Sequence, residues 1–161
     1  MSESREFLAL PIAVLTISDT RGEAEDTSGK LLVNKLSGAG HQLAEKRIVR
    51  DDIYAIRAEV SRWVASNEVS VVLTTGGTGV TGRDVTPEAF HAVYEKEVAG
   101  FGELFRMLSY EKIGTSTIQS RATGGVTLRA RRPPLASATT SEYALTGAPS
   151  VGGMLHVSMR L

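Results

Sequence analysis

The amino-acid sequence predicts an α/β protein, a three-layer αβα sandwich built on a mostly parallel, mixed sheet. Short apolar runs rich in β-branched residues alternate along the chain with longer segments whose apolar residues recur every three to four positions. Strands that alternate with helices of this length form a sheet covered on both faces. The length of 161 residues suits one domain with a real core, so we expect residues 1–161 to form a single domain, with residues 1–9 polar and frayed.

Composition excludes several classes of function. Eighteen basic and eighteen acidic residues cancel, so no overall field attracts nucleic acid or an anionic membrane. The absence of cysteine excludes disulfides, thiolate metal sites and a cysteine nucleophile. His41, His91 and His156 have no metal-ligand spacing, which argues against a zinc site or a catalytic triad. With no leader sequence and no apolar run of about twenty residues, we expect a cytoplasmic protein that binds neither membrane nor nucleic acid.

The first half of the chain predicts two strand–helix pairs. Ile12–Ile17 is typical of a central strand, whereas residues 41–50 alternate poorly and suit an edge strand. Thr27 is expected to cap the first helix, which ends at Gly38. The apolar residues of this helix are Leu31, Leu32 and Leu36. Residues 51–52 precede a second, amphipathic helix, whose apolar positions are Ile53, Ile56, Val60, Trp63 and Val64.

The most informative stretch runs from Val69 to Ala89. It begins with a short apolar run that predicts a buried strand, and four glycines follow within residues 76–82. Because glycine lacks Cβ, a bulky anion can approach such a main chain closely. The segment Thr86–Glu88 then predicts a helix start, with a capping hydroxyl, a proline and an acid in the first turn. Strand, glycine loop and helix N-terminus together indicate an anion site.

Three other interpretations fit this loop less well. A nucleotide P-loop would end in Gly-Lys-Ser/Thr, whereas this chain has Gly82-Arg83-Asp84. Residues 77–82 match the dinucleotide fingerprint G-x-G-x-x-G, which would predict an oxidoreductase that binds nicotinamide. In that motif the helix begins at the glycines, but Pro87 places the helix start later. A mobile glycine hairpin without a ligand would need neither an Arg-Asp pair nor a capped helix.

Downstream of the loop, the pattern predicts a helix from Pro87 and then a second helical run, Glu103–Ser109. The apolar positions of the first are Phe90, Val93 and Val98. Glu95–Glu97 are expected on its solvated face, and Gly100 and Gly102 interrupt it.

Three predicted loops meet at the carboxyl ends of the strands, where ligands bind in sheets of this kind: residues 18–26, 50–52 and 74–86. Asp51 and Asp84 each lie at a strand end beside a helix start. A carboxylate pair near a phosphate-binding loop supplies the oxygen ligands that Mg²⁺ takes. We therefore expect both aspartates to hold magnesium. The alternatives are that Asp52 is only a helix cap and that Asp84 only braces the loop.

The sixteen residues Thr74–Ala89, TTGGTGVTGRDVTPEA, resemble the signature of the MoaB/MogA family of molybdenum cofactor biosynthesis proteins. The likeness covers roughly residues 10 to 122 and is nearest to the MoaB branch. Other similar segments are Leu15–Asp19, Asp26–Gly29, Tyr54–Arg57 and Gly100–Ala122. The resemblance implies the α/β fold of molybdopterin-binding proteins.

The resemblance also implies roles for individual residues. Asp51 and Asp84 match positions that the family treats as catalytic. Main-chain donors of the glycine loop would hold a phosphate, threonine hydroxyls would add donors, and an arginine could reach the same phosphate. The residues expected to bind the pterin or the nucleotide are Ser18, Asp19, Thr75, Gly76, Gly77, Thr78, Gly79, Arg83 and Ser120.

The reaction implied by the resemblance is adenylyl transfer. The terminal phosphate of molybdopterin attacks the α-phosphorus of Mg-ATP and gives adenylyl-molybdopterin and pyrophosphate. The alternative is a MoaB-type oligomer that binds molybdopterin with little or no turnover; the intact segment Arg83–Pro87 favours the enzyme. The resemblance further implies a homotrimer or homohexamer and, as candidate partners, other molybdenum cofactor biosynthesis proteins.

Residues 123–161 form an atypical tail. From Ala122 onward the chain has one acid, four arginines and no lysine, and no helical or strand period persists. The family pattern would be a strand, a Pro-Gly turn and a closing helix, so the last strand of the sheet is in doubt. The abrupt end of the match suggests either a shifted reading frame or true divergence, which the coding DNA would decide.

Overall fold

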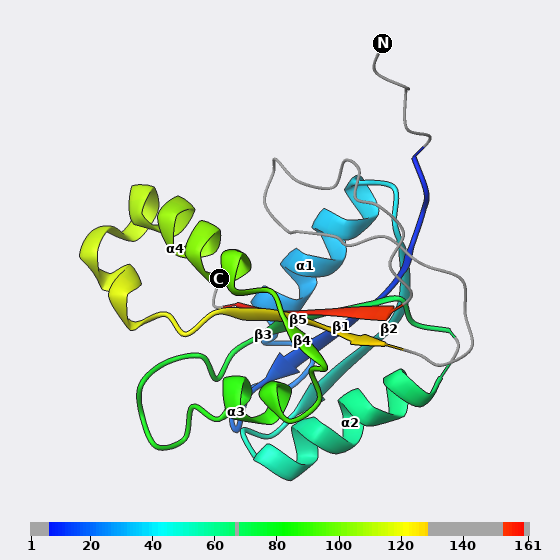
Figure 1. Cartoon of the computed structure of the whole chain (residues 1–161), viewed down its shortest axis with the longest axis horizontal. Helices are drawn as coiled ribbons and strands as arrows, with labels where there is room; N and C mark the ends of the chain where they lie inside the picture. Colours follow the sequence, from blue (N-terminus) through cyan, green and yellow to red (C-terminus); the bar gives the residue numbers. More distant parts are fainter. Residues whose placement is uncertain (1–6, 67, 129–152, 160–161) are drawn as a thin grey trace.

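The computed structural model describes residues 7–66, 68–128 and 153–159. Within them the sheet has the order β2-β1-β3-β6-β5-β4. The strands are β1 Pro11–Ile17, β2 Gln42–Val49, β3 Val71–Thr75, β4 Lys96–Glu97, β5 Thr123–Leu128 and β6 Gly153–Met159. The first four strands of that order are mutually parallel, and β5 and β4 continue the sheet by antiparallel pairing. The predicted mostly parallel, mixed sheet is confirmed, with β2 at its edge (Figure 1).

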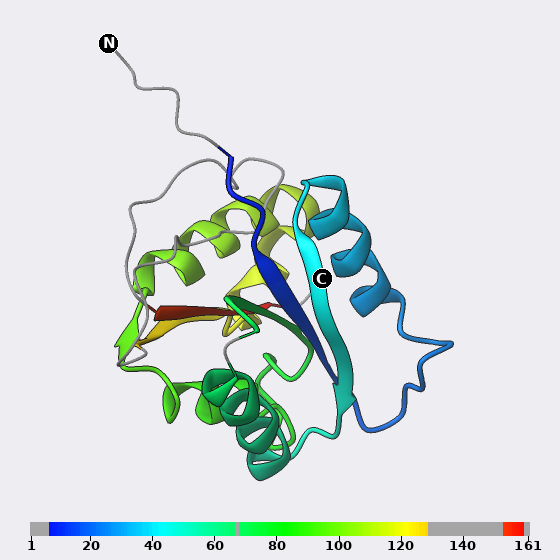
Figure 2. The same cartoon turned by 90° about the vertical axis from the view of Figure 1, so that its right-hand side faces the viewer.

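Helices cover both faces of this sheet. The helices are α1 Thr27–Gly38, α2 Ile53–Ala65, α3 Thr86–His91 and α4 Ala99–Ile113, followed by a 3₁₀ helix, Gly114–Gln119. Helices α1 and α4 lie on one face and α2 and α3 on the other, which makes the predicted three layers (Figures 1 and 2). None of the described helices is long and apolar enough to cross a membrane.

The two faces of β1 explain this layering. Ile12 and Val14 belong to the core under α1 and α4, while Ala13 and Leu15 belong to the core over α2 and α3. Successive strand side chains point to opposite faces, so a continuous apolar run serves both cores. Trp63 on α2 is 1% exposed, as expected of a core residue.

Two expected helix caps differ in the structure. The carboxylate of Asp26, not Thr27, caps α1, because its Oδ1 accepts from the Gly29 N–H at 2.9 Å. Thr86 makes no cap, and its hydroxyl instead donates to the Gly76 carbonyl oxygen at 3.0 Å, which fastens the glycine loop to α3. Leu31, expected on the apolar side of this helix, is 45% exposed, whereas Leu32 and Leu36 are buried.

The predicted long helix after Pro87 is wrong. Helix α3 ends at His91, and Lys96–Glu97 forms β4, paired with β5, so this segment is not a helix face. Tertiary packing overrides the helical sequence pattern here. The Tyr94 ring packs so closely on Gly125 that a Cβ added to this glycine would lie 2.4 Å from the ring. Helix α4 then begins at Ala99, earlier than expected. Gly102 does not break it but lets it approach the Ala122 carbonyl oxygen, which a Cβ would meet at 2.5 Å.

The tail contributes two strands that the sequence did not predict. Strand β6 lies between β3 and β5, parallel to β3, with Val71 opposite Leu155 and Thr75 opposite Met159. The alternation of apolar and polar residues that marks a strand is missing from β5, because glycines occupy its packed positions. A Cβ on Gly124 would lie 3.0 Å from the Phe101 ring. The arginine- and proline-rich residues 129–152 lie outside the described residues, as do residues 1–6 and 160–161.

Candidate functional site

The three loops expected at the carboxyl ends of the strands do converge. The backbone N–H of Asp51, which follows β2, donates to Asp19 Oδ1 at 3.2 Å beyond β1. The N–H of Val85, in the loop after β3, donates to Asp51 Oδ1 at 3.3 Å. Arg83 forms an ion pair with Asp19. These contacts place the acidic group Asp19, Asp51 and Asp84 against the glycine loop, at the point where the chain crosses from one face of the sheet to the other.

The glycines of the loop make room for these acids. A Cβ on Gly77 would lie 2.2 Å from Thr86 Oγ1 and 3.0 Å from Asp51 Oδ1, and the φ of this residue is +63°. A Cβ on Gly79 would lie 2.7 Å from Asp84 Oδ2. From the sequence we interpreted these glycines as room for a bound ligand. In the structure the carboxylates of Asp51 and Asp84 already occupy the space that side chains at Gly77 and Gly79 would need. The phosphate contacts of the loop stay a prediction.

Asp84 is held by the loop that it follows. Its Oδ2 accepts from the N–H of Thr81 at 2.9 Å and from the hydroxyl of Thr81 at 2.6 Å. The Thr81 hydroxyl is the largest influence on the pKa of Asp84, and backbone N–H groups of Thr81 and Gly79 act in the same direction, so this pKa lies below its ordinary value. Asp84 is therefore a fixed anion that occupies the amide of Gly79, one of the donors predicted to hold a phosphate, and the amide of Thr81.

Asp51 has the opposite environment. Burial is the largest influence on its pKa and raises it, and the nearby carboxylates of Asp84 and Asp19 raise it further. The Val85 N–H and the charge of Arg83 offset this only in part. Asp51 thus carries a negative charge that the described part of the protein does not fully neutralise.

The donor set fits a magnesium ion completed by its substrate. No group of three or more His, Cys, Asp or Glu side chains that could hold a metal occurs among the described residues. Mg²⁺ commonly takes one or two carboxylates and fills its other positions with water and substrate phosphates. Asp51, half-buried beside Asp84 and poor in cationic partners, supplies such oxygens.

Several predicted contact residues are less available than expected. Thr75 and Thr78 are 3% and 1% exposed, so a phosphate reaches their hydroxyls only if the loop moves. The Ser18 hydroxyl oxygen accepts from the N–H groups of Thr20 and Arg21, at 3.3 and 3.1 Å, and so closes a turn. Ser120 lies outside the carboxylate group and accepts from Ala122 N–H at 3.4 Å. Their roles in binding stay predictions.

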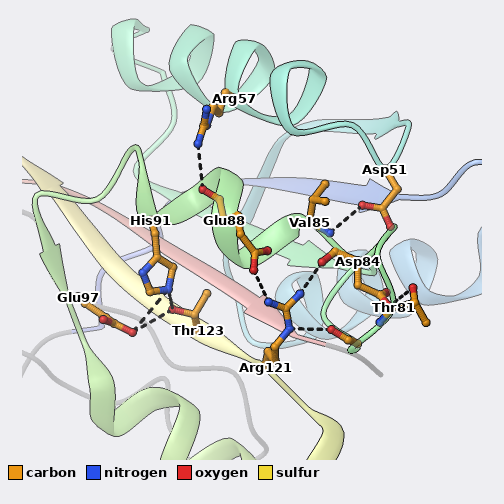
Figure 3. A network of polar contacts seen from close by, with 11 residues as sticks. Asp51, Arg57, Thr81, Asp84, Val85, Glu88, His91, Glu97, Arg121 and Thr123 are labelled. Carbon is orange, nitrogen blue, oxygen red and sulfur yellow. Dashed lines mark hydrogen bonds and ion pairs between the residues drawn. The ribbon is translucent and has the colours of Figure 1, made fainter.

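The sequence did not single out Arg121, which connects the site. Its Nε donates to the Gly79 carbonyl oxygen at 2.7 Å, and its other nitrogens contact the Asp84 carbonyl oxygen and the Glu88 carboxylate. Figure 3 shows the guanidinium of Arg121 between Asp84 and Glu88. The only signal in the sequence was its place in the similar segment Gly100–Ala122. Its partners are 33 to 42 residues away, and two of them are carbonyl groups that every residue carries.

Arg121 also borders a cavity of about 590 Å³ between α3, β4, α4 and β5. Its charged and polar lining combines acids, bases and a hydroxyl: Glu88, His91, Glu97, Glu103, Arg106, Arg121 and Thr123. His91 Nε2 lies 3.3 Å from Thr123 Oγ1, which in turn lies 3.5 Å from Glu97 Oε1 (Figure 3). The volume suits a bicyclic ligand, and the lining offers hydrogen-bond donors and acceptors side by side.

Comparison with known sequences gives a consistent result. A sequence model of the family described as "Probable molybdopterin binding domain" matches residues 13–150. Molybdenum cofactor biosynthesis protein B of Escherichia coli (strain K12) is 56% identical over 123 residues, 76% of this chain and 72% of that protein. The protein of the same name from Bacillus cereus is 53% identical over 113 residues, 70% of this chain and 67% of that protein.

Solved structures agree. A crystal structure of molybdenum cofactor biosynthesis protein B superposes with a TM-score of 0.78 at 39% identity, covering 97% of this chain and 83% of that one. The tungsten cofactor synthesizing protein MoaB from Pyrococcus furiosus superposes with a TM-score of 0.73 at 32% identity, covering 93% and 81%. The resemblance and the fold expected from the sequence are both confirmed.

Proposed function

The chain belongs to the molybdopterin-binding domain family, and on that premise we propose that it acts in molybdenum cofactor biosynthesis by transferring an adenylyl group from ATP to molybdopterin. The relatives are named for molybdenum cofactor biosynthesis, which supports the pathway. The cleft supports the chemistry, because it combines a glycine loop with acids suited to a divalent cation.

The two halves of the site suit the two ends of the pterin substrate. A pterin ring presents hydrogen-bond donors and acceptors along one edge, which the mixed lining of the 590 Å³ cavity can match. Its phosphate would then extend past Arg121 toward the glycine loop, where the carboxylates lie. ATP would approach the same loop from the side of Asp19 and Asp51.

The residues of the cleft would act by position and charge. One oxygen of the pterin phosphate forms the new bond to the α-phosphorus of ATP, and the bond from that phosphorus to the β-phosphate oxygen breaks, so pyrophosphate leaves. Asp51 and Asp84 would hold Mg²⁺, which offsets the negative charge that gathers on the phosphate oxygens. No residue needs to form a covalent intermediate, and the loop contributes by keeping the reacting groups aligned.

The observation that carries the proposal is the close approach of both acids to the glycine loop: a Cβ on Gly77 would lie 3.0 Å from Asp51 Oδ1, and a Cβ on Gly79 would lie 2.7 Å from Asp84 Oδ2. Carboxylates so placed suit a divalent cation that bridges to a substrate phosphate. The direct test is release of pyrophosphate by the purified protein with molybdopterin, ATP and Mg²⁺. Release that requires all three supports adenylyl transfer, and no release above background would rule it out.

One observation favours the alternative, a molybdopterin-binding protein with little turnover. The carboxylate of Asp84 already accepts from Thr81 and from a loop amide, which leaves it fewer lone pairs for a metal. Asp84→Asn separates the two functions. In an enzyme we expect pyrophosphate release to fall about 100-fold with molybdopterin affinity within about threefold of wild type, because a charge acting on the transition state is lost. In a binding protein the substitution changes neither measurement.

We also propose a homotrimer or homohexamer, on the basis of the family resemblance, and a cytoplasmic location. Helix α4 and the 3₁₀ helix carry exposed apolar side chains that support an assembly: Leu104, Met107, Tyr110, Ile113 and Ile118. Molar mass by light scattering tests the assembly. A trimer or hexamer that Met107→Glu dissociates supports α4 as the contact, and a monomeric wild type overturns the assembly.

A further inference from the structure

The segment Thr78–Glu88 is tied to Arg121 at both of its ends. At the first end, the backbone N–H of Arg121 donates to the Thr78 carbonyl oxygen at 3.0 Å and its Nε donates to the Gly79 carbonyl oxygen at 2.7 Å. At the other end, the guanidinium contacts the Asp84 carbonyl oxygen and the Glu88 carboxylate. The residues between these contacts, Val80 to Arg83, are exposed.

This pattern fixes the place of Asp84. Its carbonyl group is held by Arg121 while its carboxylate is held by Thr81, so backbone and side chain are anchored from two sides. The planar fork of an arginine can bind two carbonyl oxygens and a carboxylate at once, whereas a lysine offers one point charge. Without the fork, the carbonyl groups of Gly79 and Asp84 lose their guanidinium contact, whereas the Arg121 backbone N–H still holds Thr78 and Thr81 still holds the Asp84 carboxylate.

We propose that Arg121 is a positioning residue, which locks the glycine loop and Asp84 in the arrangement that the transfer reaction uses. The proposal deepens the function proposed above and rests on it. Arg121 borders both the cavity and the loop. It acts through the loop and Asp84 rather than on the reacting atoms.

Arg121→Lys tests the proposal, with Arg57→Lys as the matched control. Arg57 Nη2 also donates to Glu88, at its carbonyl oxygen (3.2 Å), but does not contact the loop. Hydrogen exchange of the full chain reports on the loop without any substrate. We expect the amides of Gly79 and Thr81 to exchange about tenfold faster in Arg121→Lys and at the wild-type rate in Arg57→Lys.

Activity gives the second readout. In Arg121→Lys we expect kcat for pyrophosphate release to fall about tenfold or more while the KM for ATP changes less than threefold. The variant loses the alignment of the reacting groups in the transition state but keeps the binding of ATP in the ground state. Glu88→Gln, which removes the charge of one of the three guanidinium partners but keeps an acceptor oxygen, should give a smaller fall.

The outcomes separate the two proposals. Wild-type exchange rates at Gly79 and Thr81 in Arg121→Lys overturn the positioning role, as does an equal loss of kcat in Arg57→Lys. If the wild-type protein releases no pyrophosphate, adenylyl transfer fails, and the exchange rates alone still decide whether Arg121 locks the loop.

Discussion

Asp26 is fully buried and Asp51 is half-buried, and both lie next to helix starts. Their electrostatic surroundings are opposite. Asp26 is 0% exposed and accepts from Gly29 N–H and Thr16 Oγ1, both at 2.9 Å, with Lys46 Nζ at 2.6 Å. Burial would raise its pKa, but these partners together lower it. Asp51 accepts a single, 3.3 Å hydrogen bond from the residues that the structure describes and has two acidic neighbours, and its pKa is raised.

From this difference we infer that Asp26 serves the fold, and it supports our proposal that Asp51 serves a ligand. When a buried charge is fully paired, removal of one partner is costly because the other is left unpaired. A buried charge that lacks a cation destabilises the native state and is retained because a ligand uses it. The cation that Asp26 has in Lys46 is, in our account, brought to Asp51 by the substrate and Mg²⁺.

The largest expected effect comes from Asp51→Asn. Pyrophosphate release should fall about 100-fold or more, because the variant loses a charge that stabilises the transition state. Its free energy of unfolding should rise, because the uncharged amide removes repulsion by Asp84 and Asp19. Kinetics and urea unfolding on the same preparation check both quantities. A variant that loses both activity and free energy of unfolding would contradict a ligand role for Asp51.

Asp26→Asn should do the reverse. We expect its free energy of unfolding to fall by about 3 kcal/mol. The variant leaves the buried ammonium group of Lys46 without its carboxylate partner and can place the NH₂ group of asparagine against it. Activity per folded molecule should stay at the wild-type level. Glu23→Gln is the control: Glu23 also pairs with Lys46 but is 71% exposed, so its loss should change stability by less than about 0.5 kcal/mol.

The pH dependence of stability sharpens the same contrast. The lowered pKa of Asp26 contributes stability that is present above the ordinary value of 3.8 and is lost as the pH falls through the native pKa. The raised pKa of Asp51 contributes stability that is present below 3.8 and is lost as the pH rises through the native pKa. The stability of Asp51→Asn relative to wild type should therefore increase as the pH rises from 3.8 toward 7. That of Asp26→Asn should instead decrease as the pH rises toward 3.8, and should then stay level. Urea unfolding across both ranges checks the two signs.

The smallest expected effects concern glycines beside the carboxylates. In Gly29→Ala the new Cβ would lie 2.1 Å from Asp26 Oδ2, so we expect a loss of about 1–3 kcal/mol although alanine favours helices. Gly38, at the end of the same helix, has nothing within 4 Å, and Gly38→Ala should stabilise by about 0.5 kcal/mol. Thermal unfolding of both variants decides this. Similar shifts in Tm for Gly29→Ala and Gly38→Ala would refute the clash with Asp26.

Much of the fold was predictable because its first half follows local rules. The continuous apolar run Ile12–Ile17 and the spacing of α2 each predict their elements, and strand ends place the three loops together. The second half depends on packing. Tyr94 over Gly125 ends the helical pattern, and the glycines of β5 hide its strand period.

The candidate site was predictable only where residues lie near each other in sequence. Gly76 to Asp84 form one segment, and Asp51 lies two residues after the end of β2. Arg121 was missed because its partners are distant and two are main-chain groups. The cavity was missed for a related reason, since its lining comes from four elements, one of which, β4, was expected to be helix.

The most direct test of the account is the free energy of unfolding of wild type and Asp51→Asn at pH 7, with and without ATP and Mg²⁺. We predict that the variant is the more stable protein alone, and that ligand at about 100 times its Kd stabilises wild type by about 2.7 kcal/mol and the variant far less, so that the order reverses. A variant that is less stable than wild type alone, or that gains as much from ATP and Mg²⁺, would contradict the account.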